Sequence, residues 1–236
     1  MEKKILIVVG IQSFVLLVFC IIGTFFISAK PNTTVQANTL SNHGEMDSYL
    51  SSCSNYRSDN LTVFIDAGHG GVDSGTRSTD LKYEEKTINL AIAQKVRELL
   101  EQDYNVNVFM TRETDKFIGP EQRLEIMNQV NADRIISIHC NSADNLEATG
   151  IEALYSGESQ DSKALAKNCL KEIGKATNQV NRGLINGNSI YIVRNAKSPI
   201  ALIEVGFLSN EKELNFLLKE ENQDKIAQGI VNGMMK

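Results

Sequence analysis

Beyond residue 60, short apolar runs alternate along the chain with stretches of helical hydrophobic spacing. The apolar runs, which are rich in β-branched and aromatic side chains, occupy residues 61–66, 106–111, 134–139, 150–156, 189–193 and 201–207. Helical patterns cover residues 88–99, 121–131, 160–178 and 211–235. Strands interleaved with helices predict a single α/β domain whose central sheet, of about six strands, is mostly parallel or mixed. The first, third and last runs are apolar on both faces, which is typical of central strands.

The first 28 residues have a different pattern. Residues 5–28 carry no charged side chain and follow two lysines at positions 3 and 4. As a helix rising about 1.5 Å per residue, this segment would be about 36 Å long, enough to cross a hydrocarbon core of about 30 Å. We therefore expect residues 1–28 to be a transmembrane signal anchor, with the rest of the chain on the extracytoplasmic side. A cleaved signal peptide, and hence secretion, is the alternative.

Residues 29–60 are polar, rich in Asn, Ser and Thr, and lack aliphatic periodicity, which predicts a flexible tether. The charges of the first 60 residues balance, so the formal net charge of −5 belongs to residues 61–236, the predicted folded domain. An acidic domain argues against nucleic-acid binding, because phosphate contacts require a basic surface.

The sequence shows neither a cysteine framework nor the motif of a serine or cysteine nucleophile. The four cysteines lie at positions 20, 53, 140 and 169 and form no C-x-x-C pair, so neither a zinc ribbon nor a disulfide-stapled fold is indicated. No G-x-S-x-G motif is present. Cys140 is adjacent to His139, but successive strand residues point to opposite faces, so the two would not form a nucleophile and base pair.

Two histidines suggest a metal site. His69 lies in a glycine-rich loop and His139 ends a predicted strand, and both are at the carboxyl end of a strand, where α/β sheets bind ligands. The loop is not a dinucleotide site, because its G-x-G-x-x-G spacing fails at Asp73. A catalytic zinc ion normally has three protein ligands and one open position. Either Glu84 or Glu85, before the first predicted helix, could be the third ligand.

Glu204 interrupts the otherwise apolar run 201–207. Burying a carboxylate costs several kcal/mol unless it is paired, protonated or beside a metal. Leaving one member of a buried ion pair without its partner costs about 3–5 kcal/mol. An ion pair with Arg112 or Arg123 would explain its presence. So would a role as general base beside a metal ion.

Four motifs share the order and spacing of one enzyme family: FIDAGHGG at 64–71, EK at 85–86, SIHCN at 137–141 and IEVGFLSN at 203–210. Together they resemble the zinc-dependent N-acetylmuramoyl-L-alanine amidases. The resemblance implies that His69, Glu85 and His139 bind one Zn²⁺ and that Glu204 is the catalytic carboxylate. It also implies that residues 61–236 hydrolyse the amide between the lactyl group of N-acetylmuramic acid and L-Ala of the peptidoglycan stem.

Three further residues are candidates for substrate contacts. Stem peptides carry carboxylates, which Arg112 or Arg123 could hold, and Asn141 could orient the substrate or a ligand. For each of the three, a structural role fits the sequence at least as well as a substrate contact does.

The expected organisation is an anchor, a tether and a catalytic domain without wall-binding repeats. It is similar to that of the sporulation amidases that prepare spore cortex for muramic-lactam formation and germination. We therefore expect peptidoglycan as substrate, the membrane as attachment site, and an exported activator or lipoprotein as partner. The alternatives are a vegetative cell-separation amidase, a metal-dependent peptidoglycan carboxypeptidase and a non-catalytic wall-binding protein.

Overall fold

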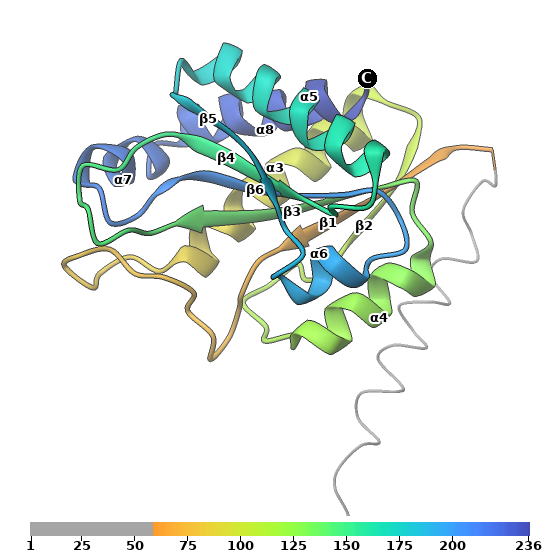
Figure 1. Ribbon diagram of the computed structural model, residues 1–236, viewed down its shortest axis with the longest axis horizontal. Coiled ribbons are helices and arrows are strands. Elements are labelled where there is room, and N and C mark those ends of the chain that lie inside the picture. Colours follow the sequence, from red (N-terminus) through yellow and green to blue (C-terminus); the bar gives the residue numbers. More distant parts are fainter. Residues whose placement is uncertain (1–58) are drawn as a thin grey trace, which may run out of the picture. The chain divides into compact units, whose positions relative to one another are not determined.

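The computed structural model describes residues 59–236, so the predicted anchor, residues 1–28, and nearly all of the tether, residues 29–60, lie outside it. Within the described range, no helix combines the length and apolar character needed to cross a bilayer. The described residues form one six-stranded mixed sheet with helices against both faces (Figure 1). The α/β class predicted from the sequence is confirmed.

The strand order is β2-β1-β3-β6-β4-β5. The strands span β1 (Leu61–Ala67), β2 (Val106–Met110), β3 (Arg134–Asn141), β4 (Ile151–Tyr155), β5 (Asn181–Asn186) and β6 (Ile200–Phe207). Strands β2, β1, β3 and β6 are parallel, whereas β4 pairs antiparallel with β6 and parallel with β5. As predicted, the three runs that are apolar on both faces, β1, β3 and β6, lie side by side in the middle of the sheet.

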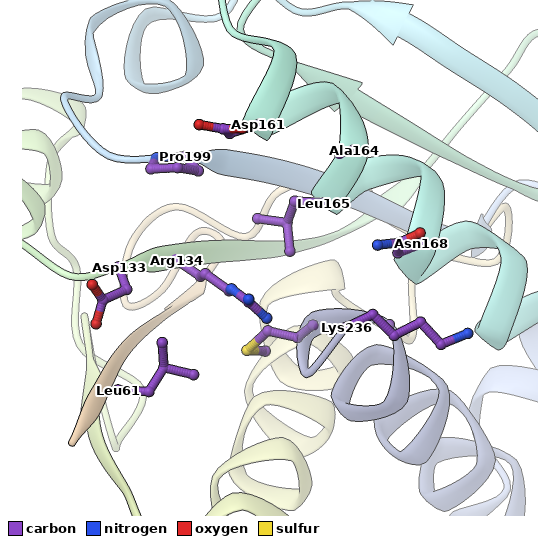
Figure 2. A pocket seen from close by; sticks show the side chains of 11 residues that line it. Leu61, Asp133, Arg134, Asp161, Ala164, Leu165, Asn168, Pro199 and Lys236 are labelled. Atoms are coloured by element: carbon purple, nitrogen blue, oxygen red, sulfur yellow. The ribbon is translucent and has the colours of Figure 1, made fainter.

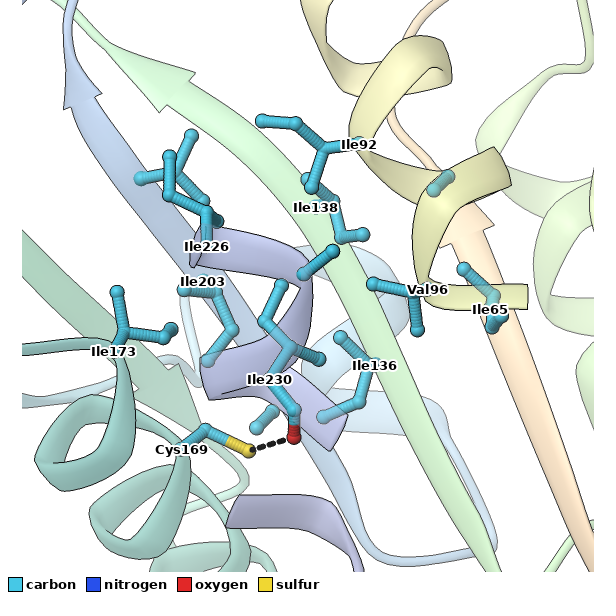
Figure 3. Packing of buried hydrophobic residues seen from close by; sticks show 14 of the residues in the cluster. Ile65, Ile92, Val96, Ile136, Ile138, Cys169, Ile173, Ile203, Ile226 and Ile230 are labelled. Carbon is cyan, nitrogen blue, oxygen red and sulfur yellow. Dashed lines mark hydrogen bonds between the residues drawn. The ribbon is translucent and has the colours of Figure 1, made fainter. Parts of the chain in front are cut away.

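Two hydrophobic layers hold the helices on the sheet. One face is covered by α3 (Glu85–Asp103), α5 (Gln160–Thr177) and α8 (Glu220–Met234), and the other by α4 (Pro120–Val130) and α6 (Tyr191–Asn195). Figure 3 shows the larger layer, in which aliphatic side chains of β1, β3 and β6 meet those of α3, α5 and α8. The Cys169 thiol is buried there and donates to the Ile230 carbonyl. Both layers leave the carboxyl ends of the parallel strands for polar side chains.

The predicted strand at 189–193 is wrong. Residues Tyr191–Asn195 form the short helix α6, which buries Ile192 and Val193, while Ile190 and Tyr191 remain exposed. The fifth strand is instead β5, an edge strand with the sequence NRGLIN and no buried residue. An edge strand that buries no side chain needs no alternation of apolar and polar residues. The hydrophobic pattern therefore did not predict β5.

The helix predicted at 211–235 is two helices, α7 (Glu211–Leu217) and α8. The break falls at Lys219, whose backbone is extended. Side chains from the first turn of α8 satisfy the last carbonyls of α7: Asn222 Nδ2 donates to Phe216 O at 3.0 Å and Gln223 Nε2 to Leu217 O at 2.8 Å. Such side-chain bonds replace the helical ones that are lost at the break.

Glycines bring α8 close to α5. A Cβ placed on Gly229 would lie 2.6 Å from the Cα atom of Ile173, a main-chain atom that cannot move aside alone. By contrast, a Cβ on Gly174, in the last turn of α5, would meet nothing closer than 3.8 Å. The two helical glycines therefore differ sharply in the space available to them.

We predict that Gly229→Ala destabilises the protein by about 1–3 kcal/mol, because the added methyl group overpacks the α5–α8 contact. The matched change Gly174→Ala should be neutral or stabilising by up to about 1 kcal/mol, since it gains helix propensity without a clash. Thermal unfolding of the two variants measures the difference. Equal stabilisation by both would show that the helices are not packed this closely.

Candidate metal centre

Three segments bring the predicted ligands together at the carboxyl edge of the sheet. His69 lies in the loop after β1, His139 is near the end of β3, and Glu85 is the first residue of α3. His69 Nε2 is 3.2 Å from Glu85 Oε2, and His139 Nδ1 is 3.0 Å from Glu85 Oε1. One ligand atom from each residue lies within 4.8 Å of the other two. The Glu85 carboxylate thus sits between two imidazoles.

Glu85 rather than Glu84 faces the histidines. Glu84 precedes α3 and pairs outward with Arg77 Nη2 at 2.6 Å. Glu85 is buried and accepts further bonds from Thr76 N–H at 2.8 Å and Cys140 N–H at 3.0 Å. Backbone N–H groups therefore fix the orientation of its carboxylate before any ion binds.

Asp73 holds His69 from the side away from Glu85. Its Oδ2 atom lies 2.8 Å from His69 Nδ1, and its Oδ1 atom accepts from Gly75 N–H at 3.1 Å. Because an ionised carboxylate can only accept, Nδ1 carries the proton and Nε2 is left facing Glu85. This second carboxylate was not singled out in the sequence, although its position four residues after His69 was the available signal.

The surroundings of these side chains favour positive charge. Burial alone would lower the pKa of His69, but its hydrogen bonds and charge interactions with Glu85 and Asp73 raise it to about 9. Burial would raise the pKa of Glu85, but the two histidines hold it well below its ordinary value. A site that attracts protons in this way is also suited to a metal cation.

Two glycines make room for the centre. A Cβ on Gly68 would overlap the His139 ring. Gly75 has a φ of +64°, and a Cβ there would lie 2.6 Å from His69 Cδ2 and also collide with Glu85. The glycine-rich loop therefore serves close approach of side chains rather than phosphate binding.

Glu204 lies next to this centre. In the sheet it is the direct partner of His139 on β3, so both side chains project from the same face. Its Oε2 atom is buried and has no hydrogen-bond partner among the described residues. Burial raises the pKa of Glu204 to about 7, the neighbouring carboxylates add to the rise, and the histidines oppose it. The ion pair with Arg112 or Arg123 considered from the sequence is absent from the described structure.

Arg112 and Arg123 instead brace the loop that carries His69. Arg112 is buried and donates to the carbonyls of Ala67 at 2.9 Å and Gly68 at 2.8 Å. Arg123 donates to the carbonyls of Ala67 at 2.8 Å and His69 at 2.5 Å. Their guanidinium groups are largely committed to the main chain, and a contact between either arginine and substrate stays a prediction.

Arg123 also neutralises a buried carboxylate. Asp66, at the end of β1, is fully buried and binds Arg123 Nη1 at 2.6 Å and Ser137 Oγ at 2.6 Å. Burial would raise the pKa of Asp66, but the charge of Arg123 and these bonds hold it below its ordinary value. Asp66 thus links β1 to α4 through Arg123 and to β3 through Ser137, and Arg123 also contacts the His69 carbonyl.

Asn141, two residues after His139 on β3, contacts Glu152 on β4. Its Nδ2 atom donates to Glu152 Oε1 at 2.6 Å, and Arg182 Nε donates to Glu152 Oε2 at 3.0 Å. Glu152 is the partner of Glu204 on β4. Glu152 and Arg182 could not be recognised from the sequence, because their position depends on strand register. A substrate contact by Asn141 stays a prediction.

A cavity of about 390 Å³ lies elsewhere, at the amino ends of the strands (Figure 2). It is lined by Leu61 and Arg134, the first residues of β1 and β3, and by residues of α5 and α8. None of the candidate metal ligands lines it. The chemistry of the carboxyl edge therefore does not extend to this cavity.

Comparison with known proteins agrees with the geometry. A family model described as N-acetylmuramoyl-L-alanine amidase matches residues 63–236. The germination-specific N-acetylmuramoyl-L-alanine amidase of Bacillus subtilis (strain 168) is 34% identical over 188 residues, covering 74% of this chain and 78% of that protein.

Two solved structures are also similar. An N-acetylmuramoyl-L-alanine amidase from Clostridium difficile 630 has a TM-score of 0.73 and 37% identity, covering 75% of this chain and 96% of that one. The CwlD amidase from Clostridioides difficile, solved in complex with the GerS lipoprotein, has a TM-score of 0.72 and 36% identity, covering 75% and 97%. With a family match over most of its length and the four motifs in place, this chain belongs to the N-acetylmuramoyl-L-alanine amidases, a family of hydrolases.

Proposed function

We propose that this protein uses Zn²⁺ to hydrolyse the amide bond between the lactyl group of N-acetylmuramic acid and L-Ala of the peptidoglycan stem. The observation that carries the proposal is the grouping of His69, Glu85 and His139 within 4.8 Å, beside a carboxylate oxygen of Glu204 that has no partner within residues 59–236. A family of amidases that act on this bond supports the choice of substrate.

The residues present fit a zinc ion. Two imidazoles and one carboxylate are ordinary zinc ligands, and three protein ligands leave one coordination position open. With both imidazoles neutral, the site would keep a formal charge of about +1. Bound zinc would supply Lewis acidity, polarising the amide carbonyl and acidifying a nearby water.

Glu204 would move the proton. Its carboxylate accepts a proton from the attacking water as the new carbon–oxygen bond forms, and then delivers it to the L-Ala nitrogen as the carbon–nitrogen bond breaks. No hydrogen bond from a described residue holds its Oε2 atom, so no structural contact commits that oxygen. Glu85 is not assigned this role, because both its oxygens face the candidate metal-binding imidazoles and accept from backbone N–H groups.

The biological setting that we propose is spore cortex maturation, in which removal of the stem precedes muramic-lactam formation. The germination-specific amidase of Bacillus subtilis supports this setting by its similarity. The amidase solved with the GerS lipoprotein supports an exported lipoprotein as partner. The catalytic domain would then act outside the cytoplasmic membrane, and attachment through residues 1–28 stays a prediction.

Glu204→Gln should lower kcat by about 10²–10⁴-fold while zinc content is unchanged, because the amide cannot accept the proton. The measurement is mass spectrometry of muropeptides after incubation with the full chain and Zn²⁺. The products expected from the unmodified protein are a stem peptide starting with L-Ala and a muramic acid with a free lactyl carboxylate.

The control is Glu84→Gln, which changes a neighbouring carboxylate that points away from the histidines and should leave the rate within about twofold, the size of an exposed ion-pair effect. Products that keep the link between muramic acid and L-Ala would contradict the proposed reaction. Undiminished cleavage by Glu204→Gln would contradict the role of Glu204.

Asp73 is a positioning residue for the metal, because it fixes the proton of His69 on Nδ1. Asp73→Ala should raise the Kd for Zn²⁺ by about 10–100-fold, as is usual when a carboxylate behind a ligating histidine is lost. The Kd of Asp73→Asn, which keeps an acceptor atom, should lie between those of the unmodified protein and Asp73→Ala. Chelator competition measures these constants.

Asp80→Ala is the matched control for Asp73→Ala, because Asp80 lies in the same loop but bonds only locally to Ser78 and Lys82. An unchanged Kd in Asp73→Ala would show that Asp73 does not orient the ligand.

A further inference from the structure

A row of ionisable side chains crosses the sheet from the metal centre towards its β5 edge. His139 on β3 pairs with Glu204 on β6, and Glu204 pairs with Glu152 on β4. Laterally paired residues share a face of the sheet, so the three side chains stand side by side. The next strand, β5, ends the row, and its contribution is Arg182.

Arg182 reaches this row because of an irregularity in β5. Ile151 pairs with Asn181 and Glu152 with Gly183, so Arg182 is an extra residue with no partner on β4. Such insertions bend a strand and redirect a side chain, and they are frequent beside active sites. Here the insertion places the Arg182 Nε atom 3.0 Å from Glu152 Oε2.

The guanidinium of Arg182 is held in a fixed orientation but keeps donors to spare. Besides the bond to Glu152, its Nη1 atom donates to the Thr149 carbonyl at 3.2 Å. Its Cζ atom lies 4.9 Å from the centre of the Phe207 ring, which supports the guanidinium plane. A guanidinium has five N–H groups, and these two bonds use one on Nε and one on Nη1. The remaining N–H groups have no acceptor among the described residues, and 41% of the side chain is exposed.

Arg112 and Arg123 differ from Arg182 on this point. Both are buried, and their guanidinium groups donate to main-chain carbonyls beneath the loop of His69. Arg182 is therefore the arginine that combines exposure, a fixed plane and proximity to Glu204 through Glu152.

We propose that Arg182 determines substrate specificity by binding a carboxylate of the peptide stem beyond the scissile amide. Arg182 lies two strands from Glu204, a separation of about 10 Å at the usual strand spacing. An extended peptide covers that distance in about three residues. The free edge of a guanidinium matches a carboxylate through two parallel hydrogen bonds. This inference rests on the proposed function, since it assumes that the stem leaves the centre in the direction of β5.

The test compares two muramoyl tripeptides, one with free stem carboxylates and one with the same groups as carboxamides. The unmodified protein should show a KM about 10–100-fold lower for the free acid, the usual effect of a hydrogen bond between charged groups. Arg182→Ala should remove this preference by raising KM for the free acid alone. Arg182→Lys, which keeps the charge beside Glu152 but not the fork, should lie between.

Arg194→Ala is the control, because Arg194 is exposed on α6 and donates to the Asn188 carbonyl away from the row. It should leave both KM values unchanged. If Arg182 only neutralises Glu152, its loss will lower kcat for both substrates alike and leave the preference intact, and that result would overturn the inference. So would equal KM values with the unmodified protein. Failure to cleave either tripeptide would overturn the proposed function itself, and this inference with it.

Discussion

The placement of one buried carboxylate, that of Glu85, between the imidazoles of His69 and His139 is the constraint on which the site depends. Three segments remote in sequence must converge for this contact to form. The loop after β1 can turn back only because glycines leave room for the rings, and Arg112 and Arg123 hold its carbonyls in place. Much of the polar structure at this edge of the sheet thus keeps three side chains in one position.

Sheet register supplies the rest of the site. Because Glu204 pairs with His139 on one side and with Glu152 on the other, hydrogen bonding between backbones sets the spacing of these three side chains. The aliphatic layer against α3, α5 and α8 fixes that register, since a slip by one residue would turn the Glu204 carboxylate into the apolar layer that Ile203 and Val205 occupy. The hydrophobic core and the geometry of the candidate site are therefore not independent.

Much of the fold could be predicted from the sequence, because β1, β3 and β6 are apolar on both faces and can only be central. Strand β5 and helix α6 could not, since an exposed edge strand and a short amphipathic turn depend on their neighbours rather than on their own pattern. The two histidines at strand ends could be recognised as candidate metal ligands, and Glu204, in an apolar strand, as a candidate general base. The contacts of Glu152 and Arg182 could not be predicted, because they follow from register and from an inserted residue, and Asp73 was marked only by its position four residues after His69.

The most direct measurement is anomalous X-ray diffraction at the zinc edge from crystals of the protein grown with Zn²⁺. The account predicts one ion about 2.0–2.2 Å from His69 Nε2, a Glu85 oxygen and His139 Nδ1, with Glu204 outside its coordination shell. An ion bound elsewhere, an ion ligated by Glu204, or no ion at this site would contradict it.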